Sequence, residues 1–134
     1  MDTDETQMGS EAKDYSLEPI TRELIGAAFE VHNVLGYGFL ERVYQRAMQV
    51  ELTLRKVKVE LEPKLQVHFK GGIIGDYAAD LLVEDRIVVE LKADPEYQPA
   101  HEAQLLKELK ATQVRLGYLI NFGGTKVECK RMVM

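Results

Sequence analysis

The segment DYAADLLVEDRIVVELKA, residues 76–93, has two apolar runs around a charged turn, and Asp80, Glu90 and Lys92 interrupt those runs. If residues 84–86 form a three-residue hairpin loop, Asp80 lies directly opposite Glu90, and the two-residue period of a strand puts Lys92 on the same face. Carboxylates placed in this way repel each other by about 1 kcal/mol in water and about 4 kcal/mol at a partly covered site. A divalent cation would relieve that repulsion, because Mg²⁺ prefers hard oxygen ligands and needs only one or two protein carboxylates.

The same triplet of charges has simpler interpretations. A two-residue loop would place the two acids on opposite faces of the hairpin. A solvated sheet face could also carry the three charges, with one salt bridge worth about 0 to 1 kcal/mol. If a metal is bound, Lys92 is placed to orient a water molecule or a phosphate oxygen. The three-residue loop also gives the hairpin an apolar second face, which we expect to lie in the core: Ala79, Leu81, Val83, Ile87, Val89 and Leu91.

Helical periodicity precedes the hairpin. Apolar residues recur at three- and four-residue steps over 17–35 and again over 39–56, which predicts two amphipathic helices that pack against each other. Gly36 and Gly38 separate these helices. From residue 57 the period becomes two. The remaining pattern predicts strands at 57–61, 65–69, 76–83, 87–93 and 116–122, a helix at 100–112 and a last strand after Gly124.

The composition is that of one globular domain with a charged leader. The chain has 134 residues, 46% of them hydrophobic, and a net charge of −5. We expect residues 1–16 to form an acidic, disordered leader and residues 17–134 to form a single domain. Since the leader carries most of the net charge, the charge of the remainder neither favours nor excludes a nucleic-acid partner.

Neither a membrane span nor a targeting signal is visible. No apolar run reaches the length of a span, and the first residues lack the features of a secretory leader or a transit peptide. The single cysteine, Cys129, cannot form an internal disulfide, which is typical of a reducing compartment. We therefore expect a cytoplasmic protein without a membrane partner.

Family motifs extend over most of the chain. Asp80 followed ten residues later by Glu90-Leu91-Lys92 resembles the D…(D/E)xK signature of the PD-(D/E)XK nuclease superfamily. The segment VHNVLGYGFLERVYQRAM, with Gly38, Glu41 and Tyr44, resembles the motif that names the GxxExxY protein family within that superfamily. HEAQLLKELKAT and LGYLINFG are similar to that family's later blocks, so the resemblance covers residues 17–133.

The resemblance implies an α/β (α+β) fold, with a restriction-endonuclease-like core, a central mixed β-sheet flanked by helices and an N-terminal helical hairpin. It also implies hydrolysis of phosphodiester bonds with Mg²⁺ (or Mn²⁺), in DNA more than in RNA. By position in the motifs, the metal ligands would be Asp80, Glu90 and the carbonyl of Leu91, and the catalytic side chains would be Lys92, Glu41 and Gln104.

Two further residues of the helical hairpin could support such a site. Tyr44 lies one turn after Glu41 on the same helix face, where it is either a core residue or a hydrogen-bonding partner of the site. His32 lies beside the apolar stripe of the first helix. A histidine in that position is more often packed and hydrogen-bonded than catalytic.

Three positions depart from the family pattern and put substrate handling in question. Ala78 stands where an arginine is usual, Glu62 where a glutamine is expected, and Glu108 where the helix usually has a tyrosine. One rival hypothesis is therefore a catalytically weak or inactive module that binds nucleic acid or a protein partner, or that forms a homo-oligomer. Phosphohydrolase action on a small nucleotide is a third hypothesis.

Overall fold

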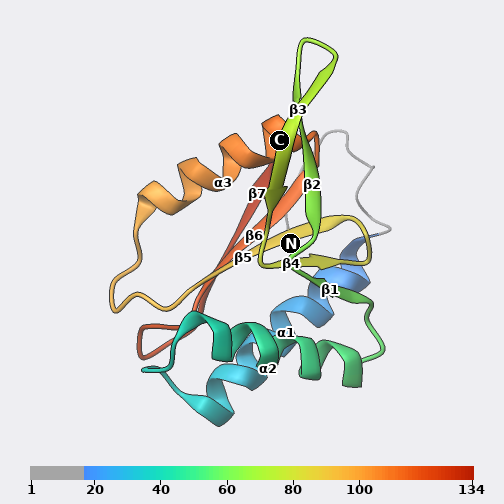
Figure 1. The fold of residues 1–134 in the computed structure, drawn as a ribbon. Coiled ribbons are helices and arrows are strands. Elements are labelled where there is room, and N and C mark those ends of the chain that lie inside the picture. The colour runs from blue at the N-terminus through green and yellow to red at the C-terminus, as the bar shows by residue number, and fades with distance from the viewer. Residues whose placement is uncertain (1–16) are drawn as a thin grey trace.

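The structure is a computed structural model that describes residues 17–134 (Figure 1). The leader predicted for residues 1–16 lies outside the described residues. No helix of the described part combines the length and the apolarity needed to cross a membrane. In chain order the elements are α1 (Glu18–Leu35), α2 (Glu41–Leu54), β1 (Val59–Leu61), β2 (Lys64–Phe69), β3 (Gly72–Ala78), β4 (Leu81–Val83), β5 (Ile87–Lys92), α3 (Pro99–Thr112), β6 (Leu116–Asn121) and β7 (Glu128–Val133).

A five-stranded sheet in the order β1-β4-β5-β6-β7 forms the centre of the fold. Strands β5 and β6 are parallel, and the other neighbours are antiparallel. Two parallel neighbours need a crossover connection, which α3 provides. The predicted fold class, a central mixed sheet flanked by helices, is confirmed.

Helices cover both faces of this sheet (Figure 1). Leu24 of α1 and Met48 of α2 pack with one face of the sheet, where Leu91 of β5 is 1% exposed. On the other face, Leu105 of α3 packs with Val88. A strand buried on both faces explains why β5 reads as an almost continuous apolar run. The polar residues in it, Glu90 and Lys92, therefore stand out.

The prediction of a single strand over 76–83 is wrong, because the chain bends within this segment. The first part belongs to β3, where Ala78 lies opposite Lys64 of β2. The chain bends at Asp80 and joins the central sheet only at β4. Two hydrogen bonds to the Asp80 carbonyl oxygen, including one from the backbone N–H of Glu62 at 3.0 Å, hold this bend. Ala79 accordingly packs with the cluster around α3 instead of the α1 and α2 side.

Strands β2 and β3 pair only with each other and form a separate two-stranded sheet, which we call the arm. Figure 1 shows the arm projecting beyond α3. Its base is anchored, since Leu65 and Tyr77 pack with the cluster around α3. A register shift between Val67 and His68 interrupts the ladder halfway along the arm.

The second helix is shorter than the predicted 39–56. Gly36 and Gly38 have φ values of 71° and 108°, in the left-handed region that glycine tolerates. Leu40 remains extended with ψ 155°, so α2 begins at Glu41. The apolar residues at the start of the predicted helix thus belong to the connection, and the helix period alone could not exclude them.

The hydroxyl group of Tyr44 holds this connection in place. It donates a hydrogen bond to the carbonyl of Gly36 at 2.6 Å and accepts one from the backbone N–H of Phe39 at 3.3 Å. The ring, which is fully buried, stacks on Phe122 with centroids 4.6 Å apart.

We expect Tyr44→Phe to lower the free energy of unfolding by about 1 to 3 kcal/mol, because it removes both hydrogen bonds and leaves the partly buried carbonyl of Gly36 and the N–H of Phe39 without their partner. Urea unfolding followed by circular dichroism would measure this loss. Tyr37→Phe is the control, since Tyr37 is 61% exposed and lies in the same connection. Equal stability of the two variants would contradict the role given to the Tyr44 hydroxyl.

Candidate active site

Strands β4 and β5 bring Asp80 and Glu90 together. Val83 pairs with Ile87, as the three-residue loop requires, and this register puts Asp80 across from Glu90 just beyond the ladder. Oδ2 of Asp80 accepts a hydrogen bond from the backbone N–H of Leu91 at 2.7 Å. The backbone of Asp80 in turn is a hydrogen-bonding partner of the Glu90 carboxyl group. Asp80 thus bonds to the backbone of the residue after Glu90, and Glu90 bonds to the backbone of Asp80.

One oxygen of the Glu90 carboxyl group, Oε2, is buried without a hydrogen-bond donor. Burial raises the pKa of Glu90 to about 8. The nearby carboxylates of Glu108 and Glu41 contribute to this increase, and Lys92 opposes it. A buried oxygen without a donor is costly unless a cation or water contacts it.

The Asp80 carboxyl group is perturbed in the same direction. Burial raises its pKa, and the charges of Glu62 and Glu108 raise it further, against the N–H of Leu91 and the charge of Lys92. Five acids therefore influence one another at this end of the sheet, with Lys92 as the opposing charge: Asp80, Glu90, Glu41, Glu62 and Glu108. Such a surplus of negative charge fits a bound divalent cation.

The donor set suits a hard cation with few protein ligands. Among residues 17–134, no group of three or more His, Cys, Asp or Glu side chains could hold a metal ion. A metal here would rest on Asp80 and Glu90, with a backbone oxygen and waters completing its ligands, as Mg²⁺ commonly does. The carbonyl of Leu91 is on the appropriate side, because the N–H and C=O groups of one strand residue point the same way and its N–H meets Asp80.

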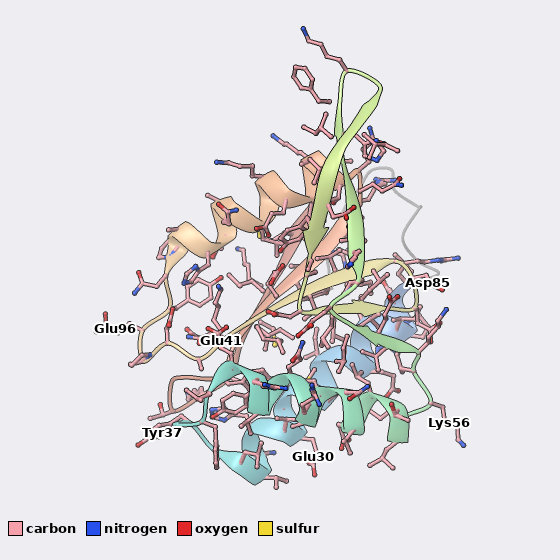
Figure 2. All side chains as sticks on the ribbon, in the orientation of Figure 1. Glu30, Tyr37, Glu41, Lys56, Asp85 and Glu96 are labelled. Carbon is pink, nitrogen blue, oxygen red and sulfur yellow. The ribbon has the colours of Figure 1, made fainter. Side chains whose placement is uncertain are left out.

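Helices α2 and α3 bring two more of the predicted residues near these acids. Glu41 is exposed at the start of α2 (Figure 2) and is close enough to raise the pKa of Glu90. Gln104 is exposed on α3, and its amide donates a hydrogen bond to Glu108 at 2.9 Å. Tyr77 donates to the other oxygen of Glu108 at 2.6 Å, so Glu108 links the arm to α3.

His32 and Tyr44 pack on Phe122 and bond to backbone groups. Nε2 of His32 is 2.9 Å from the carbonyl oxygen of Gly124. The rings of His32 and Tyr44 both stack on Phe122, whose backbone N–H donates to the carbonyl of Lys92 at 2.8 Å. Both residues therefore contact the segment that pairs with Lys92, and their side chains form hydrogen bonds with backbone groups of Gly124, Gly36 and Phe39.

Sequence reasoning missed Gln45, whose side chain is buried next to the site. Its amide donates to the carbonyl oxygen of Asp80 at 3.1 Å and to the carboxylate of Glu62 at 3.4 Å. Gln45 is 5% exposed, although it is polar. The sequence spacing could have indicated Gln45, because it lies four residues after Glu41 and hence on the same face of α2.

The raised acid pKa values predict an unusual pH dependence of stability for the metal-free protein. Between the ordinary pKa of 4.5 and the folded value of about 8, Glu90 holds its proton in the folded state and loses it in the unfolded state. The free energy of unfolding should then fall as pH rises from 5 to 8, by roughly 2 to 4 kcal/mol. Urea unfolding in EDTA would measure this, with Glu90→Gln as the comparison. Identical slopes for both proteins would contradict it.

Comparison with known proteins gives a family and a fold. A family model described as the PD-(D/E)XK nuclease superfamily matches residues 18–132. No curated protein matches the chain. A solved structure described as "Crystal structure of SSO0001" has a TM-score of 0.54 and 17% identity, covering 88% of this chain and 59% of that one.

A second solved structure is the alkaline exonuclease LHK-Exo from Laribacter hongkongensis, with a TM-score of 0.50 and 15% identity. This chain is covered to 96% and the exonuclease to 72%. At such identities the likeness concerns the fold, whereas the family match extends over nearly all described residues. The chain therefore belongs to the PD-(D/E)XK nuclease superfamily.

Proposed function

We propose that this protein is a metal-dependent nuclease that hydrolyses phosphodiester bonds in DNA. The observation that carries the proposal is the buried, unpartnered Oε2 of Glu90 beside Asp80. The superfamily supports it, because PD-(D/E)XK nucleases generally depend on a divalent metal. We assign Asp80, Glu90 and the carbonyl of Leu91 to the metal, which is Mg²⁺ or Mn²⁺.

The chain's own residues would perform the rest of the reaction. When bound, the metal would lower the pKa of a water molecule and offset negative charge on the phosphate. Lys92 would donate hydrogen bonds to the attacking water or to a phosphate oxygen, which stabilises the charge that develops in the transition state. Gln104 would contact the substrate phosphate, and Glu41 would hold a water at the mouth of the site.

Within the superfamily, we assign the chain to the GxxExxY family. Each motif residue has a separate place in the structure. Gly38 takes a positive φ, Glu41 begins α2 and raises the pKa of Glu90, and Tyr44 bonds to the connection between the helices. The motif thus describes one connection that sets where α2 begins.

A screen of substrates and metals tests the proposed activity. The purified protein would be incubated with single- and double-stranded DNA and RNA in Mg²⁺ or Mn²⁺, with EDTA as the blank. We expect DNA to be cleaved only when metal is present. Absence of cleavage on every substrate, or cleavage that persists in EDTA, would contradict the proposal.

The surplus of acids favours a second candidate, a nuclease-fold module that binds nucleic acid or protein without cleaving. Glu62 and Glu108, two of the departures from the family pattern, both raise the pKa of Asp80. The chain also spans 59% of the first solved structure, so a partner or a second copy could supply further surface. Calorimetry separates the candidates, because an active site should take up Mg²⁺ or Mn²⁺ and an abandoned one should not.

We also propose a reducing, cytoplasmic setting. Burial raises the pKa of the Cys129 thiol to about 11, so the thiol stays protonated and unreactive at neutral pH. Among the described residues it is a free cysteine.

A further inference from the structure

The tip of the arm exposes three large apolar side chains. Phe69 and Ile73 are each 58% exposed, and Ile74 is 65% exposed. All three border the turn between β2 and β3, and Figure 1 shows this turn beyond α3. A two-stranded ribbon is only marginally stable in water, and apolar side chains at its free end gain nothing from the fold. Contact with a partner would account for them.

The charge of the arm and of α3 fits an anionic partner. In an acidic chain, the arm (64–78) and the helix with its following turn (99–115) carry five basic residues against three acidic ones. Two of those acids accept hydrogen bonds from tyrosines, Glu108 from Tyr77 and Glu102 from Tyr97. At the tip itself, Nζ of Lys70 lies 5.4 Å from the ring centroid of Phe69, so a cation accompanies the apolar group.

The arm is also continuous with the candidate active site. β3 ends at Ala78, two residues before Asp80, so the tip and the site lie at the two ends of one strand. At about 3.3 Å per residue, the six steps of β3 from Gly72 to Ala78 extend over roughly 20 Å. This length corresponds to about six base pairs along one strand of B-form DNA. One double helix could therefore contact both places.

We infer that the arm is a second DNA contact, whose tip enters the major groove of the duplex that is cleaved at Asp80 and Glu90. The inference rests on the proposed function and names its substrate as double-stranded DNA. The major groove of B-DNA admits a two-stranded ribbon, and apolar side chains there contact thymine methyl groups. The major groove of A-form RNA is too narrow for side chains to read. Lys70 is placed to reach a phosphate beside the groove.

Binding without cleavage tests the inference. Fluorescence anisotropy in EDTA would compare 30-base-pair DNA, 30-base-pair RNA and single-stranded DNA. The double variant Phe69→Ser with Ile74→Ser should bind duplex DNA at least about tenfold more weakly and change its affinity for the other two by less than about twofold. Val50→Ser with Leu54→Ser is the matched control, since these residues are 60% and 72% exposed on α2. It should bind as the wild type does.

Two results would overturn the inference. One is a tip variant, folded by circular dichroism, that binds duplex DNA as tightly as the wild type. The other is a wild-type dimer in sedimentation that the tip substitutions dissociate, because the tip would then be a contact between copies of this chain. Failure of the proposed activity looks different, since duplex binding would still depend on the tip while no substrate is cleaved with any metal.

Discussion

Asp80→Asn should lower the rate of DNA cleavage at least about 1,000-fold while leaving the protein folded. The substitution keeps an oxygen that can accept the N–H of Leu91, which Asp80 binds at 2.7 Å. It removes one of the two negative charges proposed to hold the metal. Losing about 4 kcal/mol of transition-state stabilisation corresponds to a factor of 1,000. The measurement is kcat/KM on a duplex in Mg²⁺, with calorimetry for metal affinity and circular dichroism for folding.

Glu30→Gln provides the control for Asp80→Asn. Glu30 is an exposed carboxylate of α1 (Figure 2), outside both the candidate site and the arm. Its removal should change kcat/KM by less than about twofold. Cleavage by Asp80→Asn within tenfold of the wild type would contradict the assignment of Asp80, whatever the behaviour of the control.

Gly123→Ala should cost about 3 kcal/mol of stability and lower Tm by roughly 10 °C. A Cβ atom at Gly123 would overlap with backbone atoms of Ala93 and Asp94, neither of which can turn away as a side chain can. The neighbouring Asn121 already links the segment after β5 to the segment after β6 at this point. Its side chain accepts from the N–H groups of Asp94 at 3.0 Å and Gly123 at 3.1 Å, and donates to the carbonyl of Asp94 at 3.0 Å.

Differential scanning calorimetry would measure the effect of Gly123→Ala. Gly75→Ala is the control, because nothing lies within 4 Å of a Cβ atom at that strand position. We expect the control to melt within about 2 °C of the wild type. This contact between Gly123 and residues 93–94 directly follows Lys92. Equal melting of the two variants would therefore show that the backbone there shifts easily. Lys92 would then be held less firmly than the hydrogen bonds indicate.

The hairpin was predictable from the sequence because two local signals agree there. Alternation puts Leu81, Val83 and Val89 on one face, and only a three-residue loop keeps that face apolar. The structure has this register and this face. Asp80 and Glu90 follow from it as neighbours, so the centre of the candidate site needed no tertiary information.

The bend at Asp80 was not predictable in the same way. The segment 76–83 contains no proline or glycine, and its alternation continues through the bend. What interrupts the strand is contact with distant segments: Gln45 and Glu62 both donate to the carbonyl oxygen of Asp80. The role of Glu108 was not predictable either, because its contact with Tyr77 joins residues 31 positions apart. From the sequence, Glu108 was only a departure from the family pattern.

The separation of the arm from the central sheet has a consequence for its length. Because β2 and β3 pair only with each other, residues could be removed from both strands near the tip without leaving the core short of partners. Deleting two residues from each strand keeps the inward and outward faces and shortens the arm by about 7 Å, or two base pairs. If the arm contacts DNA as inferred, the span of duplex that it covers would thus be adjustable without changing the acids at β4 and β5.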